Sequence, residues 1–134
     1  QNGFFSKFAN EKLVVGNVIE VGTPEGKFTF EPKAERQKNY AAFVAGSGIT
    51  PVYSILKSVL EEEPNSTFVL VYGNKSTSSV IFKHQLQELT KKYSERFRIY
   101  NFYSEEEFFE DNSYNFCGRI DLNFIENLVK KVKK

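Results

Sequence analysis

The sequence predicts an α/β fold: a partial doubly wound parallel sheet preceded by a short β segment. Runs at residues 40–45 and 67–72 are apolar and without charge, which is typical of strands buried on both faces. Each run leads through a turn into apolar residues spaced as on one face of a helix. A third run at residues 98–102 alternates, as in an edge or half-covered strand. Strands that alternate with helices require right-handed crossovers, which produce a parallel sheet.

Length and composition limit the classes of protein to consider. The chain has 134 residues, enough for one domain with a core, and its 18 basic and 17 acidic residues nearly balance. We therefore expect neither nucleic acid nor a membrane as a partner. A single cysteine excludes an internal disulfide and a cysteine-bound metal cluster, and it favours a reducing, cytoplasmic location. No signal peptide or membrane-spanning run is visible, and the missing methionine and the initial Gln1 indicate part of a longer product.

The first 39 residues favour a short helix, two strands and a linker. Ser6 is a candidate cap for the helix. Alternation predicts strands at residues 17–21 and 27–30, on either side of a turn that contains proline and glycine. Residues 31–39 are charged and aperiodic, so we interpret them as a linker between two modules.

A glycine-rich turn, Gly46-Ser47-Gly48-Ile49-Thr50-Pro51, joins the first strand to the first helix. We expect Pro51 at the first helical position, where its missing N–H costs nothing. Backbone N–H groups and the helix dipole make such a turn an anion site, usually for phosphate. Pro51 stands where the ordinary dinucleotide fingerprint has a third small residue, so a turn that binds nothing remains an alternative.

A second turn, Tyr72-Gly73-Asn74-Lys75-Ser76-Thr77, follows the second strand. Carboxyl ends of parallel strands meet at one edge of a sheet, so both turns can face one ligand. Lys75, Ser76 and Thr77 offer a charge and hydroxyls to an adenosine 2′-phosphate. The alternative for Lys75 is an exposed turn lysine.

The predicted helices carry apolar residues at helical spacing. They are Val52, Ile55, Leu56, Val59 and Leu60 in the first, Phe82, Leu86, Leu89 and Tyr93 in the second, and Leu122, Ile125, Leu128, Val129 and Val132 in the third. We expect residues 61–63 to be a solvated acidic end, Pro64 to stop the first helix, and Asp121 to cap the third. Residues 105–115 have no regular pattern and are expected to form a loop.

Three further residues have side chains that could serve a functional site. His84 is the only histidine, and its place opposite Phe82 predicts an exposed side chain without a metal or catalytic role. Cys117 is expected to be an ordinary loop or buried thiol. For Arg119, a functional contact and a plain surface position are equally consistent with the sequence.

The two turns resemble the nucleotide motifs of the ferredoxin–NADP reductase superfamily, the first at residues 46–51 and the second at residues 72–75. Residues 34–37 (Ala-Glu-Arg-Gln) and 118–121 (Gly-Arg-Ile-Asp) resemble the reductase subunits of phenylacetyl-CoA epoxidase complexes. The resemblance runs in order over essentially the whole chain, which makes it more specific than any single motif.

The resemblance implies an NAD(P)H-dependent oxidoreductase. Electrons would pass from NADH or NADPH through FAD and a [2Fe–2S] centre to an oxygenase partner in phenylacetate degradation. Residues 1–32 would be the end of the FAD-binding β-barrel, with Gly3 and Ser6 at the flavin pyrophosphate, and residues 33–134 would be the NAD(P)-binding domain. Thr50 would lie near the nicotinamide and the flavin. The family often has arginine in the place of Lys75, so the resemblance does not choose between NADH and NADPH.

The resemblance also implies parts outside this chain. A Cys-Gly-Pro strand would follow Lys134, and the [2Fe–2S] domain, which needs thiolate ligands, would lie beyond it. Cys117 does not match that strand. Without it, the first strand would have an exposed apolar edge, through which we expect a homodimer. The chain alone should be inactive, and no side chain is expected to be catalytic. The rival hypothesis is a non-catalytic α/β binding or interaction module with a purely structural glycine turn.

Overall fold

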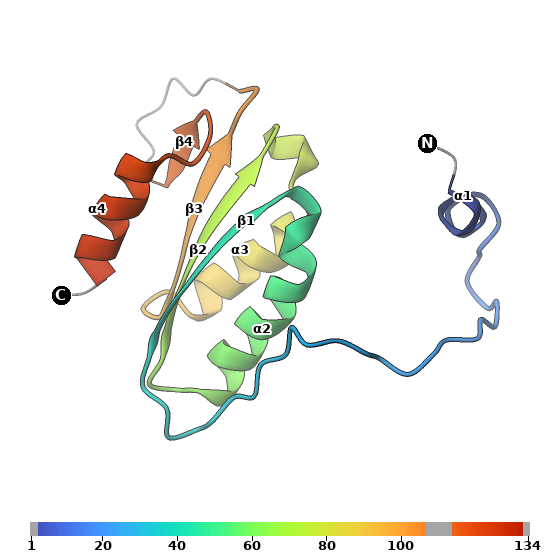
Figure 1. Ribbon diagram of the computed structural model, residues 1–134, viewed down its shortest axis with the longest axis horizontal. Coiled ribbons are helices and arrows are strands. Elements are labelled where there is room, and N and C mark those ends of the chain that lie inside the picture. Colours follow the sequence, from blue (N-terminus) through green and yellow to red (C-terminus); the bar gives the residue numbers. More distant parts are fainter. Residues whose placement is uncertain (1–2, 107–113, 133–134) are drawn as a thin grey trace.

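The computed structural model describes residues 3–106 and 114–132 (Figure 1). Its helices and strands, in chain order, are α1 (Phe4–Glu11), β1 (Asn39–Ala45), α2 (Ile49–Glu62), β2 (Thr67–Asn74), α3 (Lys83–Lys92), β3 (Phe97–Tyr103), β4 (Asn115–Cys117) and α4 (Leu122–Val132). Short 3₁₀ turns lie at Gly46–Gly48 (η1) and Thr77–Ser79 (η2). The strands form one sheet in the order β1-β2-β3-β4, and every pair is parallel. The predicted α/β class with a parallel sheet is confirmed.

The sheet has a fourth strand, β4, that the sequence pattern did not reveal. β4 has three residues, too few for alternation to be visible, and it begins at Asn115, the last residue of the expected loop. Residues 107–113 of that expected loop lie outside the described residues. The Asn101 backbone N–H donates to the Tyr114 carbonyl at 2.8 Å, and the Asn101 amide donates to Asn115 Oδ1 at 3.1 Å. β3 therefore lies inside the sheet, between β2 and β4, and not at its edge.

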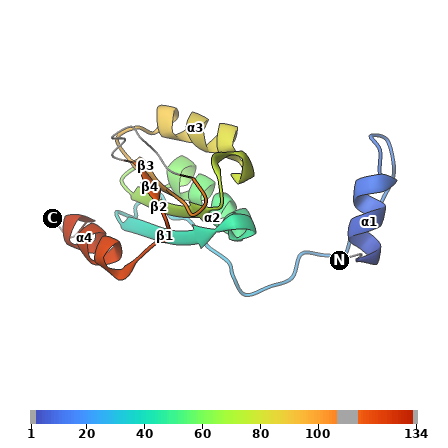
Figure 2. The ribbon, with the colours of Figure 1, turned by 90° about the horizontal axis from the view of Figure 1, so that it is seen from above.

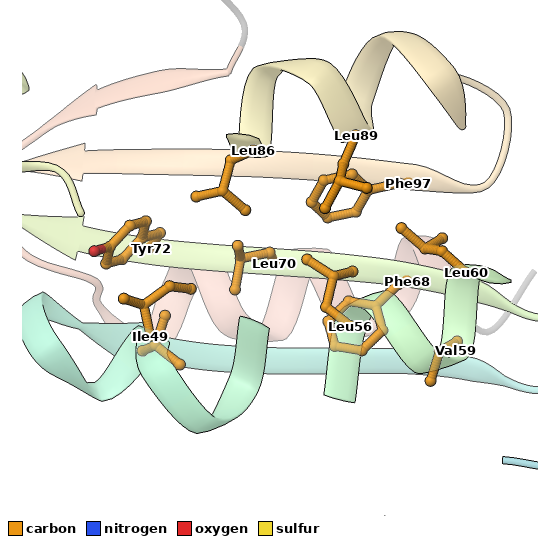
Figure 3. Close-up of a cluster of buried hydrophobic side chains, with 11 residues drawn as sticks. Ile49, Leu56, Val59, Leu60, Phe68, Leu70, Tyr72, Leu86, Leu89 and Phe97 are labelled. Carbon is orange, nitrogen blue, oxygen red and sulfur yellow. The ribbon is translucent and has the colours of Figure 1, made fainter. Parts of the chain in front are cut away.

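The main core lies between one face of the sheet and the helices α2 and α3. Leu56 and Leu60 of α2 and Leu86 of α3 meet side chains from β2 and β3 (Figure 3). The full set of buried residues in this cluster is Val44, Ile49, Leu56, Val59, Leu60, Phe68, Leu70, Tyr72, Leu86, Leu89 and Phe97. Helical spacing in the sequence therefore identified the buried faces of α2 and α3 correctly.

A second, aromatic core lies on the opposite face of the sheet, under α4 (Figure 2). The Phe124 ring of α4 lies 4.8 Å from the Phe102 ring and 5.1 Å from the Phe116 ring, between ring centroids. The predicted cap of α4 is present, because the Phe124 backbone N–H donates to Asp121 Oδ1 at 2.7 Å. β2 is covered on both faces as predicted, and within the described part no helix is long and apolar enough to cross a membrane.

β1 differs from its prediction as a strand buried on both faces. Only Val44 is buried, while the Phe43 residue is 42% exposed. The reason is position: β1 is the outer strand of the sheet, and α2 covers only one of its faces. Phe43 pairs in register with Val71, so it shares the α4 face of the sheet but lies outside the aromatic core.

The segment before β1 (residues 3–38, called the leader below) also differs from its prediction. Residues 17–21 and 27–30 form no strands and are almost entirely exposed, because a strand needs a hydrogen-bonded partner and the described chain supplies none there. α1 begins after Gly3, so Ser6 lies inside the helix and does not cap it. Figures 1 and 2 show α1 well away from the sheet, at the end of an extended segment.

Candidate functional site

The carboxyl edge of the sheet contains an open cavity of about 650 Å³. It is lined by Ala45, Gly46, Gly73, Asn74, Lys75, Ser79, Phe102, Ser104, Glu105, Gly118, Arg119 and Ile120. These residues come from the ends of β1, β2 and β3, from the turns η1 and η2, and from the segment between β4 and α4. The fold therefore brings Gly46 of the first predicted turn and Gly73, Asn74 and Lys75 of the second onto one cavity, at the edge where parallel sheets bind ligands. Gly48 does not line this cavity.

In the first turn, Gly46 and Gly48 leave the backbone uncovered by side chains. Gly46 has φ +49°, a conformation that favours glycine, and its carbonyl accepts a hydrogen bond from the Tyr72 hydroxyl at 3.0 Å. Gly48 has φ −59°, which any residue can adopt, and a Cβ there would meet nothing within 4 Å. The backbone therefore does not require glycine at position 48, although a close ligand would.

Other residues of the first turn have structural roles. α2 begins at Ile49, so Pro51 is the third helical residue, not the first, but it still lies in the turn where a missing N–H costs little. The Ile49 side chain is fully buried in the main core. The Thr50 hydroxyl donates to the Ser47 carbonyl at 2.6 Å and does not line the cavity.

The second turn contributes polar groups to the cavity. Asn74 Nδ2 is buried and makes no hydrogen bond within the described part of the chain. Buried donors are normally paired, so an unpaired amide beside a cavity is suited to a ligand acceptor. Burial raises the pKa of the neighbouring Tyr72 hydroxyl, an effect that the nearby Ile81 backbone and Asn74 side chain oppose.

Carboxylates from the end of β3 reach the predicted phosphate donors. Lys75 Nζ lies 3.3 Å from Glu105 Oε1, and both side chains are well exposed, at 75% and 60%. Glu106 Oε1 accepts hydrogen bonds from the Thr77 backbone N–H at 2.8 Å and from its hydroxyl at 3.1 Å. The Ser76 hydroxyl lies 2.9 Å from the Ser78 hydroxyl. Of the three predicted donors, only Lys75 lines the cavity.

The third wall of the cavity is the segment that follows β4. The Gly118 N–H donates to the Tyr103 carbonyl at 2.8 Å, and Gly118 has φ +89°. Arg119 and Ile120 then line the cavity, with Ile120 Cδ1 3.7 Å from the position of a Cβ on Gly73. Sequence reasoning did not assign Arg119 because it missed β4, the strand that delivers this segment to the carboxyl edge. Ser79, Ser104 and Glu105 were missed as well, since no motif marks them.

The amino edge of the sheet has a different polar cluster around Glu63, which was expected to be solvated. Its carboxylate is fully buried and accepts hydrogen bonds from the Lys33 N–H, Arg36, the Tyr40 hydroxyl and the Ser66 hydroxyl, at 2.8–3.1 Å. Burial alone would raise the pKa of Glu63, but these hydrogen bonds and the Arg36 charge lower it below its usual value. The expectation was wrong because the 33–40 segment folds back over the end of α2.

The other candidate residues lie away from the cavity. Gly3 and Ser6 belong to the region of α1, so the structure does not bring them to the two turns (Figure 1). His84 is exposed as predicted, with its Nδ1 atom 3.7 Å from Glu88 Oε1. Cys117 is exposed at the end of β4, neither buried nor in a loop.

Comparisons with known proteins identify the family of the chain. Residues 43–134 match the family model described as oxidoreductase NAD-binding domain. The chain is 39% identical over 128 residues to a subunit of 1,2-phenylacetyl-CoA epoxidase from Escherichia coli K12, covering 96% of this chain and 35% of that protein. It is 41% identical over 98 residues to the ferredoxin reductase component of 3-ketosteroid-9-alpha-monooxygenase of Rhodococcus rhodochrous, covering 73% of this chain and 27% of that protein.

The same fold occurs in a solved structure of the CS-b5R domains of human Ncb5or in its NAD⁺ form. The TM-score is 0.76 at 25% identity, over 96% of this chain and 35% of that one. The chain thus spans about a third or less of the length of these relatives. The parallel sheet, the cavity at its carboxyl edge and the family match lead to one conclusion: the chain belongs to the family of oxidoreductase NAD-binding domains.

Proposed function

We propose that the chain is the NAD(P)H-binding part of a flavin and iron–sulfur reductase that delivers electrons to an oxygenase, within phenylacetate degradation. The family match supports the dinucleotide. The oxygenase and the pathway are supported by relatives that are named as part of an epoxidase and as the reductase component of a monooxygenase. The electron carriers, FAD and [2Fe–2S], follow from the resemblance of the sequence motifs to that class of reductase.

The observation that carries the proposal is the open glycine turn at the carboxyl edge. Gly48 is not required by its backbone angle, and the space where a Cβ would stand is empty. Glycine there lets a phosphate approach the N–H groups at the start of α2. The cavity of about 650 Å³ has room for a nucleotide, and Asn74 offers a free donor.

In this proposal the chain binds and orients, while the dinucleotide supplies the hydride chemistry when bound. The turn at residues 46–48 holds the pyrophosphate through backbone N–H groups. The second turn at residues 72–77 holds the adenosine end. The Thr50 hydroxyl stabilises the first turn through its hydrogen bond to the Ser47 carbonyl. This bond holds the start of α2 in place at the nicotinamide end of the site.

The flavin side of the proposal rests on α1. Gly3 is the N-cap residue and forms no side-chain cap, so N–H groups at the start of α1 are suited to a flavin pyrophosphate. Gly3 and Ser6 would lie at that contact, with residues 1–32 as the flavin-binding module and residues 33–134 as the nucleotide module. The many exposed apolar side chains between Phe4 and Phe28 are consistent with a segment that packs within a larger module.

The proposal also includes self-association through β1. Its outer edge has no strand partner in the described part of the chain, and Phe43 beside it is exposed. Open, apolar edge strands pair readily with other chains. A second copy of the chain is therefore the proposed occupant of this edge.

The test of the nucleotide site is isothermal titration of the chain with 5′-AMP and NAD⁺. Binding by the wild type should fall about tenfold or more in Gly48→Val, because the side chain blocks charge-assisted bonds worth roughly 1.5–3 kcal/mol. Gly22→Val is the matched control, since a Cβ at Gly22 also meets nothing within 4 Å but lies in the leader. Both variants should keep the melting temperature of the wild type.

Two outcomes would contradict the proposal. Unchanged affinity in Gly48→Val would show that the turn holds no phosphate. Absence of nucleotide binding by the folded wild type would favour the rival hypothesis of a non-catalytic module with a structural turn.

A further inference from the structure

Arg119 occupies a fixed place on the rim of the cavity. On one side of it, the Gly118 N–H continues the sheet ladder to the Tyr103 carbonyl at 2.8 Å. On the other side, Ile120 packs over the second turn, where its Cδ1 atom lies 3.7 Å from the position of a Cβ on Gly73. Arg119 therefore stands between the end of β3 and the second turn, beside the proposed adenosine end of the site.

Arg119 differs from the other charged residues of the cavity in having no ion-pair partner among the described residues. Among the described lining residues only Lys75, Glu105 and Arg119 are charged, and Lys75 is paired with Glu105. No carboxylate of the described residues forms an ion pair with Arg119. Asp121, two positions along the chain, is engaged in the cap of α4. Arg119 is thus the lining cation whose charge no described acid offsets.

The hydroxyls of the second turn are less available than their sequence positions indicate. Glu106 accepts hydrogen bonds from both the N–H and the hydroxyl of Thr77, and the Ser76 hydroxyl is bonded to that of Ser78. A phosphate near this turn would meet a carboxylate on the Thr77 side. On the other side, the cavity is lined by two cations, Lys75 and Arg119, and by one carboxylate, Glu105, which pairs with Lys75.

We propose that Arg119 binds the 2′-phosphate of an NADP-type dinucleotide, with Lys75 as the second cation. The inference rests on the proposed function and deepens it by naming the phosphorylated dinucleotide as the preferred ligand. A guanidinium presents paired donors that match two phosphate oxygens, which a lysine cannot do. Arg119 therefore provides, from the segment after β4, the planar group that the second turn lacks.

The experiment compares 2′,5′-ADP with 5′-AMP by isothermal titration of the full chain. The wild type should bind 2′,5′-ADP more tightly. Arg119→Gln should weaken 2′,5′-ADP about tenfold or more and leave 5′-AMP within about twofold, as expected for loss of a charge-assisted pair. Arg119→Lys should give an intermediate affinity for 2′,5′-ADP, because it keeps the charge and loses the fork.

The matched control is Arg98→Gln, which removes the same charge from an exposed arginine near the start of β3, at the far edge of the sheet. It should leave both affinities unchanged, and melting temperatures should show that all variants fold. An unchanged ratio of the two affinities in Arg119→Gln overturns the inference and leaves the proposed function standing. Equal weakening of both ligands also overturns it, because Arg119 would then hold a group common to both. Failure of the folded wild type to bind either ligand overturns the inference and the proposed function together.

Discussion

The two edges of the sheet differ in whether the buried polar groups of the described chain have hydrogen-bond partners. At the amino edge, the Glu63 carboxylate accepts bonds from Lys33, Arg36, Tyr40 and Ser66. At the carboxyl edge, the described residues leave Asn74 Nδ2 unpaired, and an open cavity lies at the ends of the strands. The chain thus satisfies its polar groups at the amino edge, whereas the proposed nucleotide site lies at the edge where a buried donor stays unpaired.

The amino edge is a closed network that also attaches the linker. Arg96 donates to the carbonyls of Leu60, Glu63 and Ser66 at 2.7–3.0 Å, which satisfies carbonyls at the end of α2 and in the turn that follows it. Through Lys33, Arg36 and Tyr40, the same network fastens residues 33–40 to the domain. The network therefore holds the end of the leader against the domain, although most residues of the leader are exposed.

The largest expected effect on stability comes from Glu63→Gln. The change removes a buried charge that is paired and hydrogen-bonded, so the free energy of unfolding should fall by about 2–3 kcal/mol at neutral pH. Urea denaturation measures this difference. 5′-AMP affinity should not change under conditions where the variant is folded, because Glu63 lies at the edge opposite to the cavity.

The same variant has a predicted pH dependence. The pKa of Glu63 is lower in the folded chain than in the unfolded chain, so its contribution is complete above the unfolded value of about 4.3 and is lost as pH falls through the folded value. The stability difference between wild type and Glu63→Gln should thus shrink only in acid, below about pH 4. A difference that is constant from pH 7 to pH 3 would contradict the lowered pKa.

Sequence patterns predicted most of the fold and only part of the site. The covered faces of α2 and α3 were visible because apolar residues recur at helical spacing, and β2 was visible as a continuous uncharged apolar run. β4 was not visible, because three residues give no period, and the exposure of β1 depends on the order of strands, which local patterns do not contain. Pairing partners such as Glu106 and Thr77 lie 29 residues apart and depend on that order as well.

A smaller effect is expected from Arg96→Gln. Loss of its bonds to three carbonyls should lower the free energy of unfolding by about 1–2 kcal/mol, because the carbonyls belong to buried residues and lose a charged donor, while water can enter beside the half-buried position 96. Thermal melting followed by circular dichroism is a suitable measurement. Arg98→Gln, at an exposed site two positions away, is the control and should change stability by less than about 0.5 kcal/mol.

The smallest effect on stability is expected from Phe43→Lys on the uncovered face of β1. Phe43 is already 42% exposed, so the free energy of unfolding should change by no more than about 1 kcal/mol. Self-association should decrease, because a charge beside an open edge opposes strand pairing. Sedimentation velocity of both proteins tests this, and a wild type that stays monomeric at high concentration would refute the proposed dimer.

The proposed ligand site at the carboxyl edge is tested most directly by amide NMR spectra of the chain titrated with 5′-AMP. We predict that the signals of Gly46, Gly48, Gly73, Lys75 and Gly118 shift with one common dissociation constant, while those of Lys33, Glu63 and Ser66 stay in place. Shifts confined to the amino edge, or none at all at saturating nucleotide, would contradict a ligand site at the carboxyl edge.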